Sequence, residues 1–178
     1  IWAERVNDVP DTRDAETVRV IAQQYAWNIH YPGPDGKFGA TRIDLVDEQD
    51  NPIGLDRNSE FAKDDFTTIN QLHIPVNRKI RVDLSSKDVI HNFKLPELRV
   101  SQDAIPGMVI PVHFTATSTS EEFLKTAVGT KREGKGLEIA CAQLCGLGHY
   151  RMKGYVTIHE EDDYQVWLDE QAEYLEEE

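Results

Sequence analysis

Both cysteines of the chain lie in one short stretch, residues 141–152, together with one of its two methionines and one of its six histidines. Thiolate, imidazole and thioether are ligands that copper favours, and a Cys, a His and a weak axial Met belong to blue-copper electron-transfer sites. Cys145, His149 and Met152 have the spacing Cys-x3-His-x2-Met, which suits a tight loop that closes on one metal. Cys141 adds a second thiolate, and two thiolates can bridge two ions. The stretch therefore predicts a metal site.

Several other uses of these residues are compatible with the spacing alone. Cys141 and Cys145 could form a disulfide, although so small a loop is often strained. With His91 and His149 they could bind zinc, but Cys-x3-Cys is not the usual knuckle spacing and Met152 would have no role. A thioredoxin-like or copper-chaperone motif needs a βαβ setting, which the sequence does not predict. A single blue copper leaves one cysteine unused, whereas a thiolate-bridged two-copper site uses every residue.

A metal in this loop needs a further ligand from elsewhere, and His91 is the best candidate. It lies at the end of a predicted strand pair, 80–84 and 89–95. A lone histidine in such a place is more often structural than ligating, so its spacing alone does not settle the assignment. The other histidines lie in strand candidates or beside the acidic tail, and we expect them to be structural or exposed: His30, His73, His113 and His159.

The elements around the loop read as short strands separated by turns. Residues 18–31 are rich in β-branched and aromatic types and predict one strand that ends at a Pro/Gly turn cluster. Ile80, Val82 and Leu84 alternate with polar residues, so we expect them to face a core. Residues 37–66 predict a long polar connection with a hairpin or a short helix, and 121–127 a helical turn. Further strands are expected at 72–76, 89–95, 98–100, 108–116, 137–140 and 155–158.

This pattern is typical of a β-sandwich. We expect a lead-in segment at 1–17, the sandwich at 18–160 and a C-terminal helix or tail at 161–178. Acidic residues at 162–163 suit the start of that helix, and the Glu-rich end at 176–178 is expected to fray. One helical face would carry the larger side chains of the tail: Tyr164, Trp167, Leu168, Gln171 and Leu175.

Composition limits the function classes. The formal net charge of -13 disfavours nucleic acid and anionic membrane surfaces, and it fits a partner with a basic face. No run reaches the roughly 18 to 20 apolar residues of a spanning helix. No signal peptide is visible and the chain begins with Ile. We therefore expect a soluble piece of a larger protein, whose membrane anchor, if it has one, lies outside this sequence.

Three motifs together resemble a known family, the CuA domain of cytochrome c oxidase subunit II. They are Asp-Val-Ile-His-Asn-Phe at 88–93, Asp-Ala-Ile-Pro-Gly at 103–107, and Cys-x-Gln-x-Cys-Gly-x2-His-x2-Met at 141–152. Their order and spacing match from about residue 18 to 160. The resemblance implies an all-β, cupredoxin-like Greek-key sandwich with the metal at one end, and we add the C-terminal helix to it.

The resemblance also implies a dinuclear, mixed-valence copper centre. Both cysteines would bridge the two ions. His91 and Met152 would complete one copper, and His149 with the backbone carbonyl of Gln143 would complete the other. Many family members have Glu where Gln143 stands, and there the carboxylate also helps to hold magnesium. We expect Leu144 and Leu147 in the apolar shell around the site.

Electrons enter such domains near a Gln-Trp-x-Trp segment. Here the corresponding residues are Gln24-Tyr25-Ala26-Trp27, so Tyr25 takes the place of the outer Trp and Trp27 that of the inner one. The implied partners are a cytochrome c, or a fused cytochrome c domain linked through the terminal helix, and oxidase subunit I. The implied location is the outer, periplasmic face of a respiratory membrane.

Function is thus expected to be one-electron relay, with no catalysis by the isolated domain and no catalytic residue. The main alternative is a copper-delivery or copper-sensing protein that binds copper transiently through the same loop. A nitrous oxide reductase domain has a related site, but that enzyme needs a propeller domain that the sequence lacks. A zinc-stabilised module is the remaining alternative, and metal analysis separates it from the others.

Overall fold

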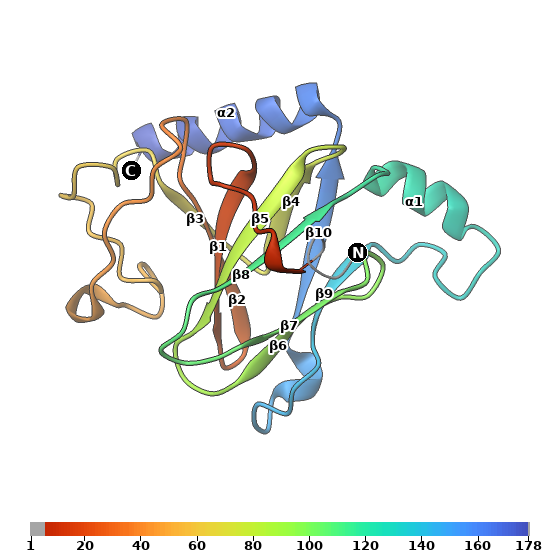
Figure 1. The fold of residues 1–178 in the computed structure, drawn as a ribbon, viewed down its shortest axis with the longest axis horizontal. Coiled ribbons are helices and arrows are strands. Elements are labelled where there is room, and N and C mark those ends of the chain that lie inside the picture. The colour runs from red at the N-terminus through yellow and green to blue at the C-terminus, as the bar shows by residue number, and fades with distance from the viewer. Residues whose placement is uncertain (1–5, 178) are drawn as a thin grey trace.

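The computed structural model describes residues 6–177, which form two five-stranded sheets packed face to face (Figure 1). The start of the predicted lead-in segment and the last residue of the predicted frayed end, Glu178, lie outside the described residues. The sheet orders are β3-β2-β1-β5-β8 and β4-β10-β9-β6-β7. The elements are β1 (Glu16–Gln23), β2 (Ala26–Tyr31), η2 (Ile43–Leu45), β3 (Phe66–Ile69), β4 (Gln71–Pro75), β5 (Lys79–Ser86), β6 (His91–Leu95), β7 (Val100–Ala104), β8 (Ile110–Thr115), α1 (Ser120–Ala127), β9 (Leu137–Cys141), η3 (His149–Arg151), β10 (Lys153–His159) and α2 (Glu161–Glu177).

The core lies between the two sheets. The alternation predicted for β5 is confirmed, because Ile80, Val82 and Leu84 are completely buried while the residues between them stay partly exposed. Trp27 of β2 and Phe93 of β6 meet across the core with ring centroids 5.5 Å apart. Two pairs of neighbouring strands are parallel, β1 with β5 and β4 with β10, and they require crossover connections. The predicted β-sandwich class is confirmed.

The single strand expected at 18–31 is wrong, because this region forms a hairpin. Strands β1 and β2 pair antiparallel, with Gln23 opposite Ala26, so Gln24 and Tyr25 make the turn. The turn carries none of the Gly, Pro, Asn or Asp residues that usually mark a hairpin, which is why the pattern hid it. The strand expected at 98–100 is also displaced, to β7. The β1–β2 turn reaches the end of the sandwich where β6 begins.

The polar connection between β2 and β3 packs beside the first sheet, at the left of Figure 1. It contains the short helix η2 and a small core of its own, in which Ile53 and Leu55 pack near Ile21 of β1. At the end of the connection, Asp65 forms a hydrogen-bonded pair with His30 of β2, with Oδ2 and Nε2 2.6 Å apart and both side chains fully buried. This contact fastens the end of the connection to the sheet.

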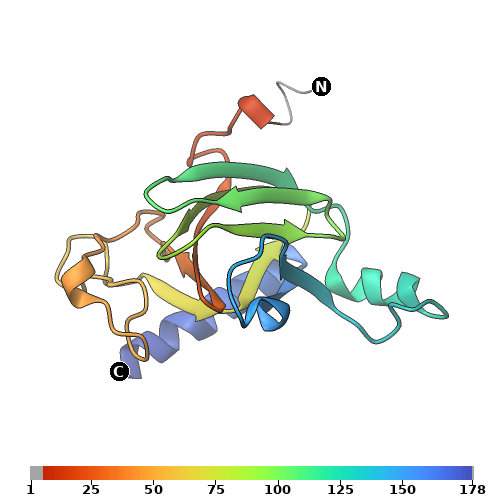
Figure 2. The same cartoon turned by 90° about the horizontal axis from the view of Figure 1, so that it is seen from below.

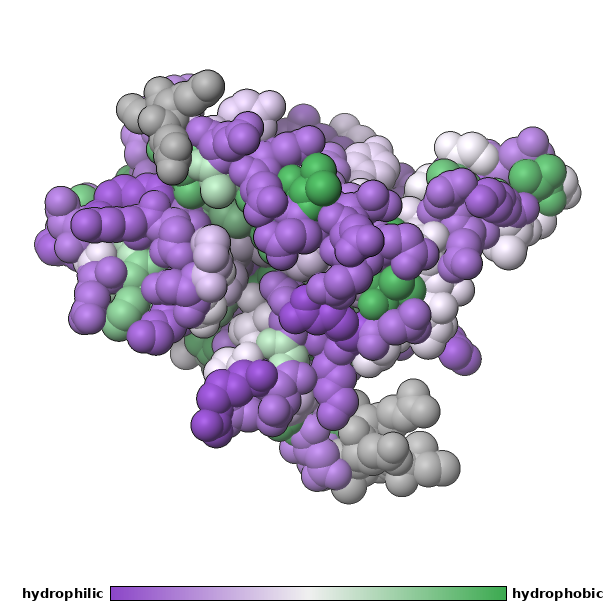
Figure 3. Space-filling view, turned by 90° about the horizontal axis from the view of Figure 1, so that it is seen from above, coloured by the Kyte–Doolittle hydropathy of each residue, from purple (hydrophilic) through white to green (hydrophobic). Residues whose placement is uncertain are grey.

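Helix α2 crosses one end of the sandwich (Figure 1). The apolar face predicted for the tail is confirmed: Tyr164 is buried, and the ring of Trp167 lies 4.2 Å from that of His73 and parallel to it. The surface on this side of the molecule is mostly hydrophilic (Figure 3). Among the described residues, no helix combines the length and apolar character needed to cross a membrane. The division of the chain into lead-in, sandwich and terminal helix stays a prediction.

Candidate metal centre

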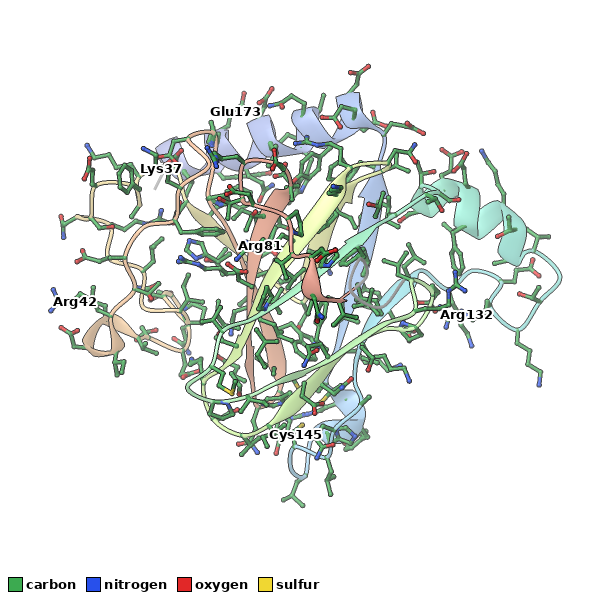
Figure 4. All side chains as sticks on the ribbon, in the orientation of Figure 1. Lys37, Arg42, Arg81, Arg132, Cys145 and Glu173 are labelled. Carbon is green, nitrogen blue, oxygen red and sulfur yellow. The ribbon has the colours of Figure 1, made fainter. Side chains whose placement is uncertain are left out.

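The predicted metal loop lies at the end of the sandwich remote from α2. Cys145 is found there, far from Glu173 of α2 (Figure 4). Strand β9 ends at Cys141 and strand β6 begins at His91, and the two strands are hydrogen-bonded neighbours. Three connections meet at this end, residues 87–90, 105–109 and 142–152, and the view from below faces them (Figure 2). The sheet therefore brings His91 to the cysteines across fifty residues of sequence.

Successive turns fold the loop between β9 and β10 back on itself. The amide of His149 donates to the carbonyl of Gly146 at 3.1 Å, and the amide of Met152 donates to the carbonyl of His149 at 3.2 Å. Gly146 has φ +127°, a conformation that side chains rarely adopt. A Cβ at Gly148 would lie 2.6 Å from ring atoms of Tyr25, so the loop can rest on the β1–β2 turn only with glycine here.

The Cys141 thiol has three potential metal-binding neighbours. Its Sγ lies 3.8 Å from Sγ of Cys145, 3.8 Å from Nδ1 of His91 and 3.1 Å from the carbonyl oxygen of Gln143. A disulfide would need about 2.05 Å between the sulfurs, so the two thiols are free. Two sulfurs at this separation can both reach an ion at the usual metal–thiolate distance of about 2.3 Å.

The Cys145 thiol is surrounded by the other predicted ligands. Its Sγ lies 3.5 Å from Nδ1 of His149 and 3.7 Å from Sδ of Met152. Cys145 and Met152 are almost completely buried, and His149 is half-buried. All six residues predicted as ligands are thus brought together, although His91, Cys141 and Cys145 alone form the tightest group, with ligand atoms within 4.8 Å of one another.

The two thiols differ in protonation. Burial acts to raise the pKa of Cys141, but hydrogen bonds from His91 and from the backbone outweigh it and lower that pKa to about 6. Burial and the negative charge of Cys141 raise the pKa of Cys145 to about 11. Burial acts to lower the pKa of His91, yet its contacts with Cys141 and Asp88 raise it. The two thiols therefore lose their protons in separate steps, with Cys141 deprotonated before Cys145.

Soft sulfur donors and two imidazoles converge here on one small volume. Such a donor set suits a borderline or soft transition metal such as copper. Metal binding requires both thiols to lose their protons, and the lowered pKa of Cys141 favours this loss for one of them. The arrangement is suited to holding metal rigidly between strands.

The two aromatic residues predicted for the passage of electrons occupy different depths. Trp27 is fully buried, with its ring centroid 6.2 Å from that of His91. Tyr25 is half-buried beneath the metal loop, and the guanidinium of Arg151 lies 5.6 Å from its ring centroid. Of the two aromatic residues matched in the sequence, Tyr25 thus lies nearer the surface and Trp27 lies inside the core.

The apolar shell expected from Leu144 and Leu147 is wrong. Their residues are 78% and 97% exposed, because the ligands of the tight loop point inward and the residues between them point to solvent. The neighbouring connections also expose large apolar side chains. The metal end therefore carries an apolar rim, which consists of Val89, Ile90, Met108, Val109, Leu144, Leu147 and Tyr150.

Two residues at the site received no role from sequence reasoning. Asp88 lies 2.8 Å from Nε2 of His91, and the side chain of Gln24 donates to the carbonyl of Cys145. Asp88 stands three residues before His91, and this spacing could have indicated that it supports the histidine. The sequence gives no such indication for the contact of Gln24 with Cys145, because that contact depends on a hairpin that the pattern does not predict. The other histidines lie away from the site, in the buried pair of His30 with Asp65, the pair of His73 with His159, and at His113 on β8.

The model of the family described as cytochrome c oxidase subunit II, periplasmic domain, matches residues 16–158. The alternative cytochrome c oxidase subunit 2 of Bradyrhizobium diazoefficiens is 34% identical over 175 residues, which cover 98% of this chain and 56% of that relative. Cytochrome c oxidase subunit 2 of Cereibacter sphaeroides is 28% identical over 162 residues, covering 86% and 48%. The chain thus spans about half the length of these relatives.

Solved structures agree with the sequence comparison. The crystal structure of the periplasmic domain of subunit II of cytochrome oxidase (CoxB) of Bradyrhizobium japonicum matches with a TM-score of 0.61 and 26% identity, covering 94% of this chain and 99% of that one. The mixed disulfide intermediate between thioredoxin-like TlpA and subunit II of cytochrome c oxidase matches with a TM-score of 0.58 and 26% identity, covering 94% and 96%.

Proposed function

Because the chain belongs to the family of periplasmic domains of cytochrome c oxidase subunit II, we propose that it relays single electrons through two copper ions. One observation carries the proposal. The sulfurs of Cys141 and Cys145 lie 3.8 Å apart, and each has its own further donors within 3.8 Å. Two thiolates so placed can each contact both ions, which a single-copper or zinc site would not require.

The proposed ligand assignment is the one that the resemblance to the family implies. Cys141 and Cys145 would hold both ions. His91, through Nδ1, and Met152 would complete one copper. His149, also through Nδ1, and the carbonyl oxygen of Gln143 would complete the other. The assignment is supported by the short distances that join these six residues, and by the burial of His91 and Met152 on the core side of the pair.

When bound, the two ions supply a one-electron couple whose charge change is shared between them. The chain's contribution is to hold the donors still. His91 and Cys141 belong to neighbouring strands, and the loop that carries the other donors is fixed by its own turns and by Tyr25. Burial of Met152 and Cys145 keeps water from that side of the centre, which lowers the local dielectric response.

Electrons would arrive from a cytochrome c and leave for the haem of subunit I. The net charge of -13 favours a donor with a basic face, and the apolar rim offers a contact surface close to the metal. Tyr25, half-buried beneath the metal loop, is the proposed point at which electrons enter, and Trp27 lies deeper, against His91. Replacement of Tyr25 by Leu should slow electron transfer from cytochrome c, whereas replacement by Phe, which keeps the ring on which the loop rests, should not.

Reconstitution with copper tests the proposed centre. Two coppers and no zinc per chain are expected, with a purple colour and an EPR spectrum in which one unpaired electron couples equally to both nuclei. Cys145→Ser should abolish that spectrum. A colourless, EPR-silent complex would instead favour the copper-delivery alternative, and zinc in place of copper would overturn the electron-transfer proposal.

A second proposal concerns the metal-free thiols. A relative of this chain forms a mixed disulfide with a thioredoxin-like protein. Here Cys141 is half-buried, whereas Cys145 is 3% exposed, so the sulfur of Cys141 is the more accessible one. We propose that an oxidised Cys141–Cys145 pair is attacked at Cys141 by a partner thiolate, which releases Cys145 as a thiolate. A second partner thiol then displaces Cys141, so the chain regains two thiols and the partner becomes the disulfide.

Trapping tests this second proposal. In the Cys145→Ser chain, Cys141 is first converted to a mixed disulfide with a small thiol. This chain should exchange rapidly with a single-cysteine thioredoxin-like protein. The matched Cys141→Ser chain, activated at Cys145, should exchange slowly. Equal rates would contradict the assignment of Cys141 as the accessible thiol.

A further inference from the structure

The β1–β2 turn contacts both segments that carry the proposed ligands. The backbone amide of Gln24 donates to Oδ2 of Asp88 at 2.7 Å, in the connection that leads to His91. The side-chain Nε2 of the same residue donates to the carbonyl oxygen of Cys145 at 2.5 Å, in the metal loop. One residue therefore joins the segment that leads to His91, 64 positions further along the chain, to the metal loop, 121 positions further along it.

The first contact reaches the His91 ring through a carboxylate. Oδ1 of Asp88 accepts the amide of Val89 at 2.7 Å and lies 2.8 Å from Nε2 of His91. With Oδ2 held by Gln24, both oxygens of Asp88 are fixed. The direction of its carboxylate then determines the rotation of the His91 ring, and hence where Nδ1 points.

The second contact acts on the backbone of a bridging cysteine. The carbonyl that Gln24 binds belongs to Cys145 itself. The hydrogen bond therefore fixes the peptide plane that follows the α-carbon of this cysteine. The following residue is Gly146, where a Cβ would come within 2.6 Å of Nε2 of Gln24. The Gln24 side chain thus occupies the space that the missing side chain leaves open.

From these contacts we infer that Gln24 is a positioning residue that sets His91 and Cys145 relative to one another, an inference that rests on the proposed copper centre. Its two contacts can be separated experimentally. Gln24→Ala keeps the backbone amide that binds Asp88 and removes only the donor to Cys145. Gln24→Glu keeps the size of the side chain and replaces the donor with a carboxylate, which repels the carbonyl oxygen.

The neighbouring residue supplies a matched control. Gln23, the last residue of β1, has the same side chain as Gln24, but that side chain contacts Glu48, Lys87 and Asn28 and none of the proposed ligands. Gln23→Ala therefore removes three hydrogen bonds beside the same turn, more than Gln24→Ala removes, and leaves the contacts of the proposed ligands in place. Circular dichroism and urea unfolding of each variant confirm that the sandwich is intact before the site is probed.

The first measurement needs no copper. In a Cys141→Ser background, the rate at which a neutral thiol reagent modifies Cys145 reports how often the loop opens. Loss of one hydrogen bond predicts a rate about 2- to 12-fold higher for Gln24→Ala and at least as high for Gln24→Glu. Gln23→Ala should match the parent. Equal rates for Gln24→Ala and the parent would overturn the inference.

The second measurement uses the copper-loaded chain with both cysteines. Competition with a chelator should show copper held about 10- to 100-fold less tightly by Gln24→Ala, with unequal coupling to the two nuclei in its EPR spectrum. Unchanged affinity and spectrum would overturn the inference. If the parent chain itself fails to bind two coppers, the proposed function is wrong, while the modification rates still decide whether Gln24 positions the loop.

Discussion

Asp88 fixes which nitrogen of His91 faces the cysteines. Its Oδ1 lies 2.8 Å from Nε2 of His91, and Nδ1 of the same ring lies 3.8 Å from Sγ of Cys141. A neutral imidazole has one N–H and one lone pair, and the carboxylate accepts the N–H. The lone pair on Nδ1 is therefore directed at the proposed copper position. Burial acts to raise the pKa of Asp88, but hydrogen bonds from His91 and the backbone outweigh it and lower that pKa.

Asp88→Ala should weaken copper binding without unfolding the domain. The His91 ring would lose the acceptor that holds its tautomer and rotation, a change that typically costs about 10- to 100-fold in metal affinity. Chelator competition measures the loss. Asp103→Ala is the matched control, because Asp103 lies on the adjacent strand and binds Asn92 at 2.8 Å but no proposed ligand. Equal affinities for the two variants would contradict the role of Asp88.

Met152→Leu should leave the centre formed but alter its spectrum. Met152 is 1% exposed, and its Sδ lies 3.7 Å from Sγ of Cys145. Leu has nearly the same volume, so the free energy of unfolding should fall by about 1.5 kcal/mol or less. Loss of the thioether changes the donor set of one copper only. Absorption and EPR spectra should therefore show two coppers with unequal coupling, whereas complete loss of copper would mean that Met152 is essential for assembly.

The proposed metal ligands could be predicted because their residue types are rare and their spacing is local. Two cysteines, a histidine and a methionine in one loop leave few chemical uses, and the structure does bring His91 to them. The strands were found where one face is buried, as in β5, since burial imposes a period of two on the sequence. These predictions need only local pattern and the preference of metals for ligands.

The residues that support the site could not be predicted in the same way. Gln24 acts through a hairpin whose turn has no sequence signature, and its side-chain amide contacts a carbonyl, which any residue could provide. Leu144 and Leu147 were placed inside because apolar residues usually are. In a tight loop the proposed ligands take the inward positions, so the side chains between them face solvent.

Asp65→Ala should destabilise the fold strongly. Asp65 and His30 are both fully buried and lie 2.6 Å apart, and Asp65 also accepts the amide of Gly39 at 2.8 Å. Removal of one partner from a buried pair leaves the other without compensation, which typically costs about 3–5 kcal/mol. Urea denaturation measures the free energy of unfolding. Asp64→Ala, at a half-buried neighbour that binds the amide of Asp35, should cost far less.

The histidine pair under α2 should make stability depend on pH. Nδ1 of His73 lies 2.8 Å from Nε2 of His159, and Trp167 of α2 packs on His73. Burial, and then the charge of His159, lower the pKa of His73 to about 4. Burial also lowers the pKa of His159, although the carboxylate of Asp163 opposes it. In the unfolded chain both imidazoles would titrate near about 6.5.

The unfolded state therefore binds more protons than the folded state at mildly acidic pH. The stability contributed by the neutral pair is fully present above about pH 6.5 and is lost as the pH falls toward about 4. Urea denaturation of the metal-free domain at a series of pH values should show this decline. A chain with both His73→Gln and His159→Gln should show a shallower one. If the double variant declines as steeply as the parent, the acid sensitivity arises elsewhere and the histidine pair does not cause it.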